Sequence, residues 1–322
     1  MAESPAINHA PVLRDEVVRY LSARFLDPPD GSGGVLVDGT VGLGGHAEAL
    51  LQALPGVRLV GIDRDSQALK RTRQRLAADE KRVTLLYGSY ADLERLLDGL
   101  GIGRIDGLLL DLGISSLQLD DAHRGFSFRS DGPLDMRMDP EQGMSAAEWI
   151  ATAPQTEIAD VLATYGEERY ARRIARAIDE ARHRGPICMT RALVEIVRAA
   201  VPASYRHGRL DPATRTFQAI RIRINGELDA LRTGLRAGFA RLDVGGVLVA
   251  ISFHSLEDRI VKRFLAERAA ACACPPELPE CVCDKQIEAE ILTRRPVTPR
   301  STEVAVNPRA RSAKLRAARK VV

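Results

Sequence analysis

The segment from residue 35 to residue 54 constrains the fold most strongly, because it reads as a buried strand, a glycine loop and a helix start. The apolar run 35–37 ends in Asp38, and the loop 39–45 contains four glycines. A glycine turn in front of a helix lets a nucleotide-like ligand approach bare backbone N–H groups. The segment therefore predicts an α/β fold with a ligand site at its first turn.

A second acidic residue, Asp63, indicates the kind of ligand. It ends the apolar run 59–62, and a carboxylate at this spacing from the loop can accept both hydroxyls of a ribose. The dinucleotide fingerprint G-x-G-x-x-G does not fit, because its third glycine is missing. The acidic-x-G-x-G-x-G loop of S-adenosylmethionine (SAM)-dependent methyltransferases fits better, with Asp38 as the acidic residue, although Thr40 replaces its first glycine. We therefore expect an adenosine-containing cofactor, with SAM favoured over NAD.

Strand and helix patterns alternate along much of the chain. Apolar runs at 35–38, 59–62, 83–87, 105–110 and 247–251 are separated by helical patterns, which predicts a mostly parallel sheet covered on both faces. From residue 114 to residue 211 no convincing strand pattern occurs, and several helices are expected instead. We therefore expect a cofactor-binding domain made of residues 1–113 and 212–322, with residues 114–211 inserted as a helical domain for substrate recognition.

Several polar side chains follow predicted strands. Open α/β sheets bind ligands beyond the carboxyl ends of their strands, which places Asp38, Asp63 and Asp111 along one edge. Tyr90 follows the third strand and either covers an adenine ring or belongs to the core. The polar segment 252–255 follows the fifth strand and either contacts the substrate or forms structural hydrogen bonds.

Four of the five cysteines lie close together in the sequence. Cys272, Cys274, Cys281 and Cys283 have the spacing C-x-C-x6-C-x-C, which brings four thiols within reach of one tetrahedral zinc ion. The C-x-C pair is less usual for zinc than C-x-x-C, and free thiols in a surface loop are the alternative. We assign no metal from the sequence alone, and a disulfide is disfavoured in a reducing compartment.

The net charge of +3 is small, but the charge is unevenly distributed. Residues 294–322 contain nine Lys or Arg and one acidic residue, Glu303. Such a segment suits an RNA phosphate backbone, and a solvated surface is the alternative. No apolar run approaches the length of a membrane span, and the first residues lack a signal-peptide core, so we expect a cytoplasmic protein without membrane contact.

Ten short motifs, spread over nearly the whole chain, closely resemble those of the bacterial 16S rRNA (cytosine-N4)-methyltransferase family, called MraW or RsmH. The motifs are DGTVGLGGH (38–46), IDRD (62–65), LLDLGISS (109–116), QLDD (118–121), RGFSF (124–128), GPLDMRM (132–138), YGEER (165–169), PATRTFQ (212–218), ISFHSLED (251–258) and NPRARS (307–312).

The resemblance implies a Rossmann-like, class I SAM-dependent methyltransferase. Its expected reaction is methylation of the exocyclic N4 of one cytidine in the decoding region of 16S rRNA, at the P site. The expected partner is 16S rRNA within the small ribosomal subunit, and no DNA is expected. By the same resemblance, the cofactor contacts are Gly44, Gly45, His46, Asp63, Tyr90, Asp111 and Gln118.

The catalytic residues are predicted from chemistry and position. The lone pair of the cytosine amine is delocalised into the ring, so catalysis should consist mainly of positioning the amine. Ser115 follows the fourth strand and His254 the fifth, and neither has an obvious role in holding SAM. We expect these two to orient the amine. A catalytically inactive RNA-binding protein and an NAD-dependent oxidoreductase on the same fold stay open as alternatives.

Overall fold

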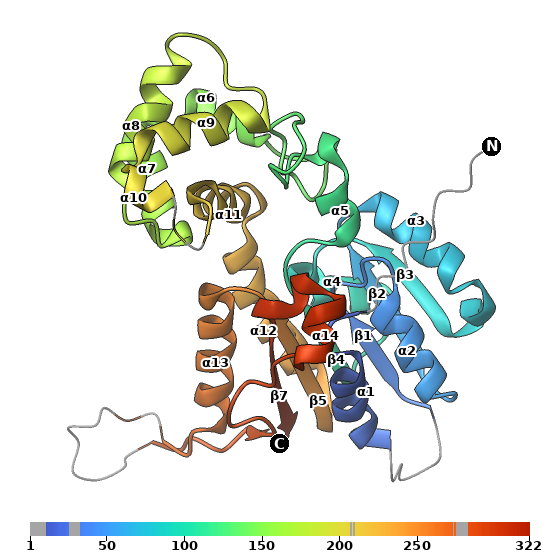
Figure 1. Ribbon diagram of the computed structural model, residues 1–322. Helices are drawn as coiled ribbons and strands as arrows, with labels where there is room; N and C mark the ends of the chain where they lie inside the picture. Colours follow the sequence, from blue (N-terminus) through green and yellow to red (C-terminus); the bar gives the residue numbers. More distant parts are fainter. Residues whose placement is uncertain (1–10, 26–32, 207, 209, 273, 275–282) are drawn as a thin grey trace. The chain divides into compact units, whose positions relative to one another are not determined.

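The computed structural model describes residues 11–25, 33–206, 208, 210–272, 274 and 283–322 (Figure 1). The chain divides into two compact units. One consists of Met1–Gly113 and Leu228–Val322, and the other of Ile114–Glu227. We call them the sheet unit and the helical unit.

The sheet unit contains one seven-stranded sheet with the order β3-β2-β1-β4-β5-β7-β6. The strands from β3 to β5 pair in parallel, whereas β7 runs antiparallel to both of its neighbours. The predicted fold class, an α/β fold with a mostly parallel sheet, is thus confirmed. The strands are β1 (Val35–Asp38), β2 (Arg58–Asp63), β3 (Val83–Tyr87), β4 (Ile105–Asp111), β5 (Leu242–Ser252), β6 (Ala289–Ile291) and β7 (Lys314–Lys320).

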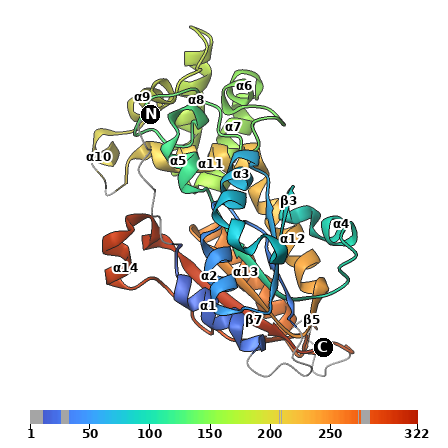
Figure 2. The same cartoon turned by 90° about the vertical axis from the view of Figure 1, so that its right-hand side faces the viewer.

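Helices cover both faces of this sheet because its central strands are apolar on both sides. Val37 of β1 belongs to a core cluster with residues of α4, α12 and α13, whereas its neighbour Leu36 belongs to a cluster with residues of α1, α2 and α3. Figure 2 shows α1, α2 and α3 together on one face. The helices of this unit are α1 (Arg14–Ser22), α2 (Gly45–Ala53), α3 (Ser66–Arg75), α4 (Leu93–Asp98), α12 (Glu227–Arg241), α13 (Ser255–Ala269) and α14 (Ser301–Val306), with short 3-10 turns at Ala23–Phe25, Ala77–Arg82, Tyr90–Asp92 and Pro308–Ser312.

The helical unit has a core of its own, in which Trp149, Leu162, Ile178 and Val197 are buried together. It contains no strand among its described residues apart from one isolated bridge between Pro133 and Met189. Its helices are α5 (Ser116–Asp120), α6 (Ala146–Thr152), α7 (Gln155–Gly166), α8 (Ala171–Arg182), α9 (Thr190–Ala200), α10 (Ala203–Arg206) and α11 (Pro212–Asn225), with a 3-10 turn at Ala122–Arg124.

The helical unit begins at the residue expected for the insertion, but it ends later. We expected it to end at residue 211, whereas the compact unit extends to Glu227. The physical reason is the apolar face of α11, since Phe217 and Ile220 are buried in the core of the helical unit. Gly226, in a left-handed conformation with φ 57°, then separates α11 from α12.

Among the described residues, no helix combines the length and the apolar character needed to cross a membrane.

Candidate active site

Three carboxylates meet at the carboxyl ends of β1, β2 and β4. The strands are in parallel register, so that Asp38 pairs with Gly61 on one side and with Leu109 on the other. This brings Asp63 and Asp111 close enough to Asp38 for their charges to raise its pKa. The edge of the sheet therefore gathers the three acidic side chains that the sequence predicted there.

Asp63 contacts the glycine loop through one carboxylate oxygen and the turn after β2 through the other. Its Oδ2 accepts a hydrogen bond from the N–H of Gly42 (2.8 Å), and its Oδ1 accepts one from the N–H of Asp65 (2.8 Å). An ionised carboxylate has about four lone-pair sites, so each oxygen can still accept a ribose hydroxyl. Asp63 therefore fits the ribose of an adenosine-containing cofactor while it shapes the loop beside it.

The loop requires glycine at the start of α2. Gly44 has φ 76°, and a Cβ built on it would lie 2.9 Å from Cγ2 of Thr72. Thr72 is buried in α3, and its hydroxyl donates to the carbonyl oxygen of Gly42. Sequence reasoning missed this second support of the loop, because a threonine inside an amphipathic helix carries no local signal of such a contact.

Thr40, the departure from the glycine-loop pattern, ties β1 to β4. Its Oγ1 accepts a hydrogen bond from the N–H of Asp111 (2.7 Å), and its own N–H donates to Oδ1 of Asp38 (3.1 Å). A glycine at this position has no hydroxyl to accept the N–H of Asp111. The threonine thus fixes two of the three carboxylate-bearing strand ends relative to each other.

His46 is buried beside Asp111, in the first turn of α2. Its Nε2 lies 3.4 Å from Oδ2 of Asp111, and the side chain is only 6% exposed. Within the described part of the chain, neither ring nitrogen has a hydrogen-bond partner, nor has Oδ1 of Asp111. Buried polar atoms in native proteins nearly always have partners, so these orphaned atoms fit a site that is completed by the polar groups of a ligand.

Burial raises the pKa of Asp38 to about 7 and the pKa of Asp63 to about 6. Removal from water penalises the charged form of each carboxyl, and their mutual repulsion adds to the shift of Asp38. A cationic ligand lowers this cost because it favours the charged forms. The electrostatics of the site therefore fit SAM, whose sulfonium group is positively charged.

Tyr90 packs against α12, where a Cβ on Gly234 would lie 2.4 Å from its ring atom Cδ2. The side chain is half-buried beside the core. Tyr90 therefore contributes to the core, which is one of its two expected roles. Its contact with an adenine ring stays a prediction. Gly45, also predicted to contact the cofactor, is the first residue of α2 and lies against Pro11.

Ser115 and Gln118 lie in the helical unit, where together they cap α5. The Oγ of Ser115 accepts from the N–H of Gln118 (3.3 Å), and the Oε1 of Gln118 accepts from the N–H of Ser115 (3.1 Å). Gln118 is buried. Their predicted roles in orienting the amine and in holding the cofactor stay predictions, since this capping box occupies one acceptor of each side chain.

His254 caps α13, the helix that follows β5. Its Nδ1 accepts from the N–H of Glu257 (3.4 Å), and its Nε2 lies 3.2 Å from Oε1 of the same residue. A neutral imidazole that accepts at Nδ1 carries its proton at Nε2, so this ring is a donor and not a proton acceptor in this arrangement. The role of His254 in orienting the amine stays a prediction. The alternative is that the side chain serves only to cap α13.

The basic carboxyl-terminal segment is partly engaged within the protein. In β7, Arg316 and Lys314 both pair with Asp258, at 2.6 and 3.4 Å, and Arg319 pairs with Glu290 at 3.1 Å. The exposed basic side chains lie before this strand, at Arg294, Arg295, Arg300, Arg309 and Arg311.

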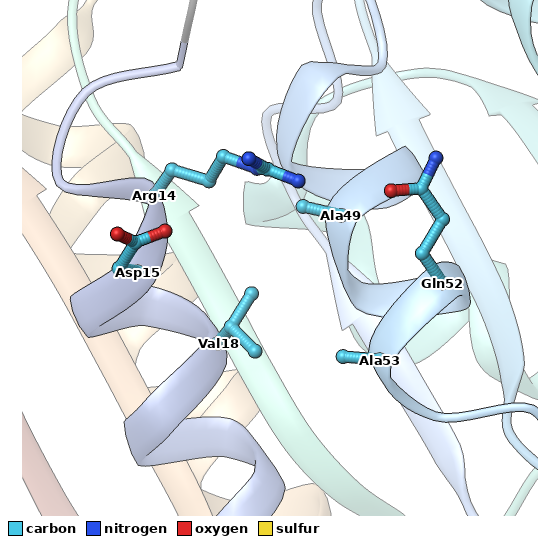
Figure 3. A pocket seen from close by; sticks show the side chains of 6 residues that line it. All are labelled: Arg14, Asp15, Val18, Ala49, Gln52 and Ala53. Carbon is cyan, nitrogen blue, oxygen red and sulfur yellow. The ribbon is translucent and has the colours of Figure 1, made fainter.

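A shallow hollow of about 360 Å³ lies elsewhere, between α1 and α2 (Figure 3). It contains none of the predicted site residues, and no role is assigned to it. The residues that line it are Arg14, Asp15, Val18, Ala49, Gln52 and Ala53.

Comparison with known proteins decides which family this site belongs to. The model of the MraW methylase family matches residues 6–321. The chain belongs to the MraW methylase family. It is therefore a SAM-dependent methyltransferase, as the motifs implied, and the oxidoreductase and inactive alternatives are not supported.

Named relatives match the chain over nearly its whole length. A protein of Syntrophotalea carbinolica named ribosomal RNA small subunit methyltransferase H is 50% identical over 97% of this chain and 98% of its own. A protein of the same name from Thermobifida fusca is 50% identical over 98% of this chain and 94% of its own. Among solved structures, the chain is similar to a putative rRNA-methylase from Clostridium thermocellum, with 11% identity and a TM-score of 0.43 over 96% of this chain and 93% of that one.

Proposed function

We propose that this methyltransferase transfers the methyl group of SAM to the exocyclic N4 of a cytidine in the decoding region of 16S rRNA, at the P site. We further propose that its substrate is the assembled small ribosomal subunit and that it acts in the cytoplasm. The observation that carries the proposal is the match to proteins named ribosomal RNA small subunit methyltransferase H, at about half identity over nearly the full length of both chains.

Methyl transfer requires the protein mainly to position the two reactants and to stabilise the developing charge. SAM, when bound, supplies a methyl group that is already activated by the positive sulfur. The amine of cytosine is a poor nucleophile because its lone pair is delocalised into the ring. The protein must therefore hold the amine in line with the methyl group at near-attack distance.

The sheet unit supplies the parts that hold the cofactor. Asp63 accepts the ribose hydroxyls, and Gly44 keeps the loop open for the rest of the molecule. The ring nitrogens of His46 and Oδ1 of Asp111 are buried atoms that can donate or accept, and none of these atoms has a hydrogen-bond partner among the described residues. A polar group of the cofactor that hydrogen-bonds to His46 and Asp111 replaces its water contacts with fixed protein partners. This contributes to both affinity and orientation.

Acceptors near the amine stabilise the positive charge that develops on nitrogen during transfer. Asp111, at the end of β4, is the carboxylate that we assign to this task. Ser115 can accept from the amine through the second lone pair of its Oγ, because the cap of α5 uses only one. The N–H of His254, in the tautomer described above, can donate to an acceptor of the cytosine ring, so we assign it the orientation of the base and no proton transfer.

Recognition of RNA is assigned to the helical unit and to the exposed arginines before β7. The helical unit carries its own core, which supports its assignment as a separate domain for substrate recognition. The exposed arginines at 294–311 suit phosphate contacts, which provide affinity without reading sequence.

The test of the substrate is a comparison of small ribosomal subunits with protein-free 16S rRNA, both taken from cells that lack the modification. Methyl transfer from labelled SAM should be faster to the subunit, because the assembled particle presents the cytidine in its folded surroundings. Equal rates on both, or transfer to the free rRNA alone, would contradict the assembled substrate. Transfer to neither would contradict the proposed function itself.

A further inference from the structure

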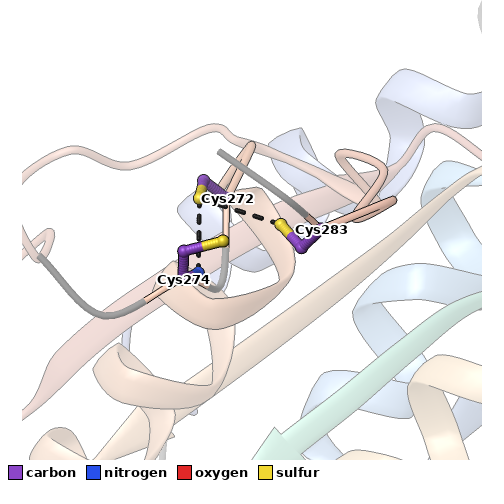
Figure 4. Close-up of side chains that lie close together, drawn as sticks. All are labelled: Cys272, Cys274 and Cys283. Atoms are coloured by element: carbon purple, nitrogen blue, oxygen red, sulfur yellow. Dashed lines mark hydrogen bonds between the residues drawn. The ribbon is translucent and has the colours of Figure 1, made fainter. Parts of the chain in front are cut away.

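Three cysteines converge beyond the end of α13, in a part of the sheet unit that the reaction does not use. The Sγ atoms of Cys272, Cys274 and Cys283 all lie within 4.8 Å of one another (Figure 4). Cys281, which the sequence groups with them, lies outside the described residues. Cys272 and Cys274 follow α13 in the sequence, whereas Cys283 comes shortly before β6.

The distances between the thiols fit a metal and not a disulfide. Cys272 and Cys283 have their Sγ atoms 3.7 Å apart. Two sulfurs bound tetrahedrally to zinc at about 2.3 Å are separated by about 3.8 Å, whereas a disulfide needs about 2.05 Å. The N–H of Cys274 also donates to Sγ of Cys272 (3.3 Å). A donor of this kind stabilises a thiolate, the form in which cysteine binds a metal.

The base of the loop is closed by independent contacts. The N–H of Glu288 donates to the carbonyl oxygen of Arg268 (2.8 Å), and the side chains of the two residues form an ion pair at 2.6 Å. Lys285 pairs with the same glutamate at 3.4 Å. These contacts fix both ends of the loop at the end of α13, so the thiols gather at a defined distance from a rigid helix.

The position in the fold separates the cluster from the active site. β5 ends at the edge of the sheet that carries the carboxylates, and α13 follows it directly. This helix has 15 residues and therefore runs about 22 Å back along the sheet before the cysteines begin. A metal held there cannot contact the transferred methyl group, so its role is structural.

We propose that Cys272, Cys274 and Cys283 bind a structural zinc ion that fastens the loop between α13 and β6. Thiolates are soft ligands, and a cluster of them without carboxylate or imidazole selects zinc over magnesium or calcium. Three thiolates suffice to hold the ion, whatever the fourth ligand is. Binding releases the thiol protons, so the zinc affinity falls as the pH is lowered.

The test measures zinc in the purified full-length chain, produced in zinc-supplemented medium and freed of loose metal by gel filtration. Elemental analysis should give about one zinc per chain. Cys272→Ser and Cys283→Ser should each lower the zinc content at least fivefold. Cys188→Ser removes an exposed cysteine of the helical unit and serves as the matched control, with zinc content unchanged.

A second measurement guards against misfolded variants. SAM affinity should stay within about twofold of wild type in Cys272→Ser, because the cluster lies away from the cofactor edge. Replacement of zinc by cobalt should give the sulfur-to-cobalt charge-transfer absorption in wild type and in Cys188→Ser only. A chain without zinc, equal zinc in Cys272→Ser and wild type, a disulfide between Cys272 and Cys283, or a coloured iron–sulfur chromophore would each overturn the proposal.

Discussion

Asp63 gives the sharpest test of cofactor binding at the scale of single residues. Asp63→Ala removes the acceptor of both ribose hydroxyls, and each bond to a charged group contributes about 1.5–3 kcal/mol. Loss of one such bond weakens SAM binding by about 10- to 150-fold. Asp63→Asn keeps one acceptor oxygen and should fall between the alanine variant and wild type in titration calorimetry.

The control for this prediction is Asp229→Ala, which removes an exposed carboxylate of α12 that pairs with Arg232. Its SAM dissociation constant should equal that of wild type. An unchanged dissociation constant in Asp63→Ala would remove Asp63 from the cofactor site.

The raised pKa of Asp63 predicts how SAM binding depends on pH. Burial raises this pKa to about 6, so the carboxyl is neutral below pH 6 and charged above it. Only the charged form accepts from both ribose hydroxyls, so SAM binding strengthens as the pH rises through about 6. Burial raises the pKa of Asp38 to about 7, which adds a second step near that pH.

Calorimetry from pH 5 to pH 8 checks this dependence. Asp63→Asn should lose the step of Asp63 and keep that of Asp38, which moves to a lower pH because the repulsion by Asp63 is gone. An affinity that is flat from pH 5 to pH 8 in the wild type would contradict the assignment of both carboxyls to the site.

At the scale of residues, the sequence predicted which carboxylates lie together at the sheet edge but not the contacts that support them. Asp38, Asp63 and Asp111 each end an apolar run, and that local pattern is enough to place them at the sheet edge. The bond from Asp111 to Thr40 spans 71 residues, and nothing local distinguishes Thr40 from a mere departure from the glycine pattern. The same holds for Thr72, whose partner Gly42 is 30 residues away.

At the scale of elements, the basic segment before β7 is expected to contribute to RNA affinity. Reversing the charge at Arg309 and Arg311 should reduce RNA affinity and flatten its dependence on salt, because each lost phosphate contact lowers the salt slope by about one. Lys314 is a poorer choice, because it pairs with Asp258 inside the sheet unit. SAM affinity should be unchanged in the double variant.

The matched control is Arg73→Glu, which reverses an exposed charge on α3. It should leave both the affinity and the salt slope close to wild type when binding is measured by fluorescence anisotropy. If the double variant at Arg309 and Arg311 keeps the wild-type slope, the basic segment is only a solvated surface.

Ser115 and His254, which cap α5 and α13, are the residues that we expect to orient the amine. Ser115→Ala and His254→Ala should lower the single-turnover methylation rate and leave SAM affinity within about twofold, as expected for contacts made mainly in the transition state. Each variant also loses a cap, which costs about 0.5–2 kcal/mol of stability.

Two controls separate the cap from the chemistry. Ser145→Ala removes an equivalent capping box on α6 and should keep the full rate. His254→Asn restores a good cap without the ring, so its rate should stay low if the imidazole orients the amine. If Ser115→Ala or His254→Asn keeps the wild-type single-turnover rate, the residue concerned is only a structural cap.

The sequence pattern of the helices does not determine where the helical unit ends. The pattern of residues 214–242 is helical throughout, and the structure divides it at Gly226 into α11 and α12. α11 and α12 are equally helical in pattern. Which core receives the apolar face of α11 depends on residues far along the chain, such as Trp149 and Leu162, so the boundary at residue 211 was placed too early.

For the whole molecule, the alternation of strands and helices was enough to predict the sheet and the edge at which the three carboxylates gather. It was not enough to predict that β7 inserts between β5 and β6, because a short strand with alternating charges fits several places in a sheet. Family membership adds the reaction, since methyltransferases and dehydrogenases share this architecture and differ in their sites.

Product analysis tests the central claim most directly. Small ribosomal subunits that lack the modification are incubated with the chain and methyl-labelled SAM, and the 16S rRNA is digested to nucleosides for mass spectrometry. The account predicts that the label appears in N4-methylcytidine, that nuclease mapping places it in the decoding region, and that Asp63→Ala greatly reduces it at low SAM concentration. Label in 5-methylcytidine, in another nucleoside or in none at all would contradict the account.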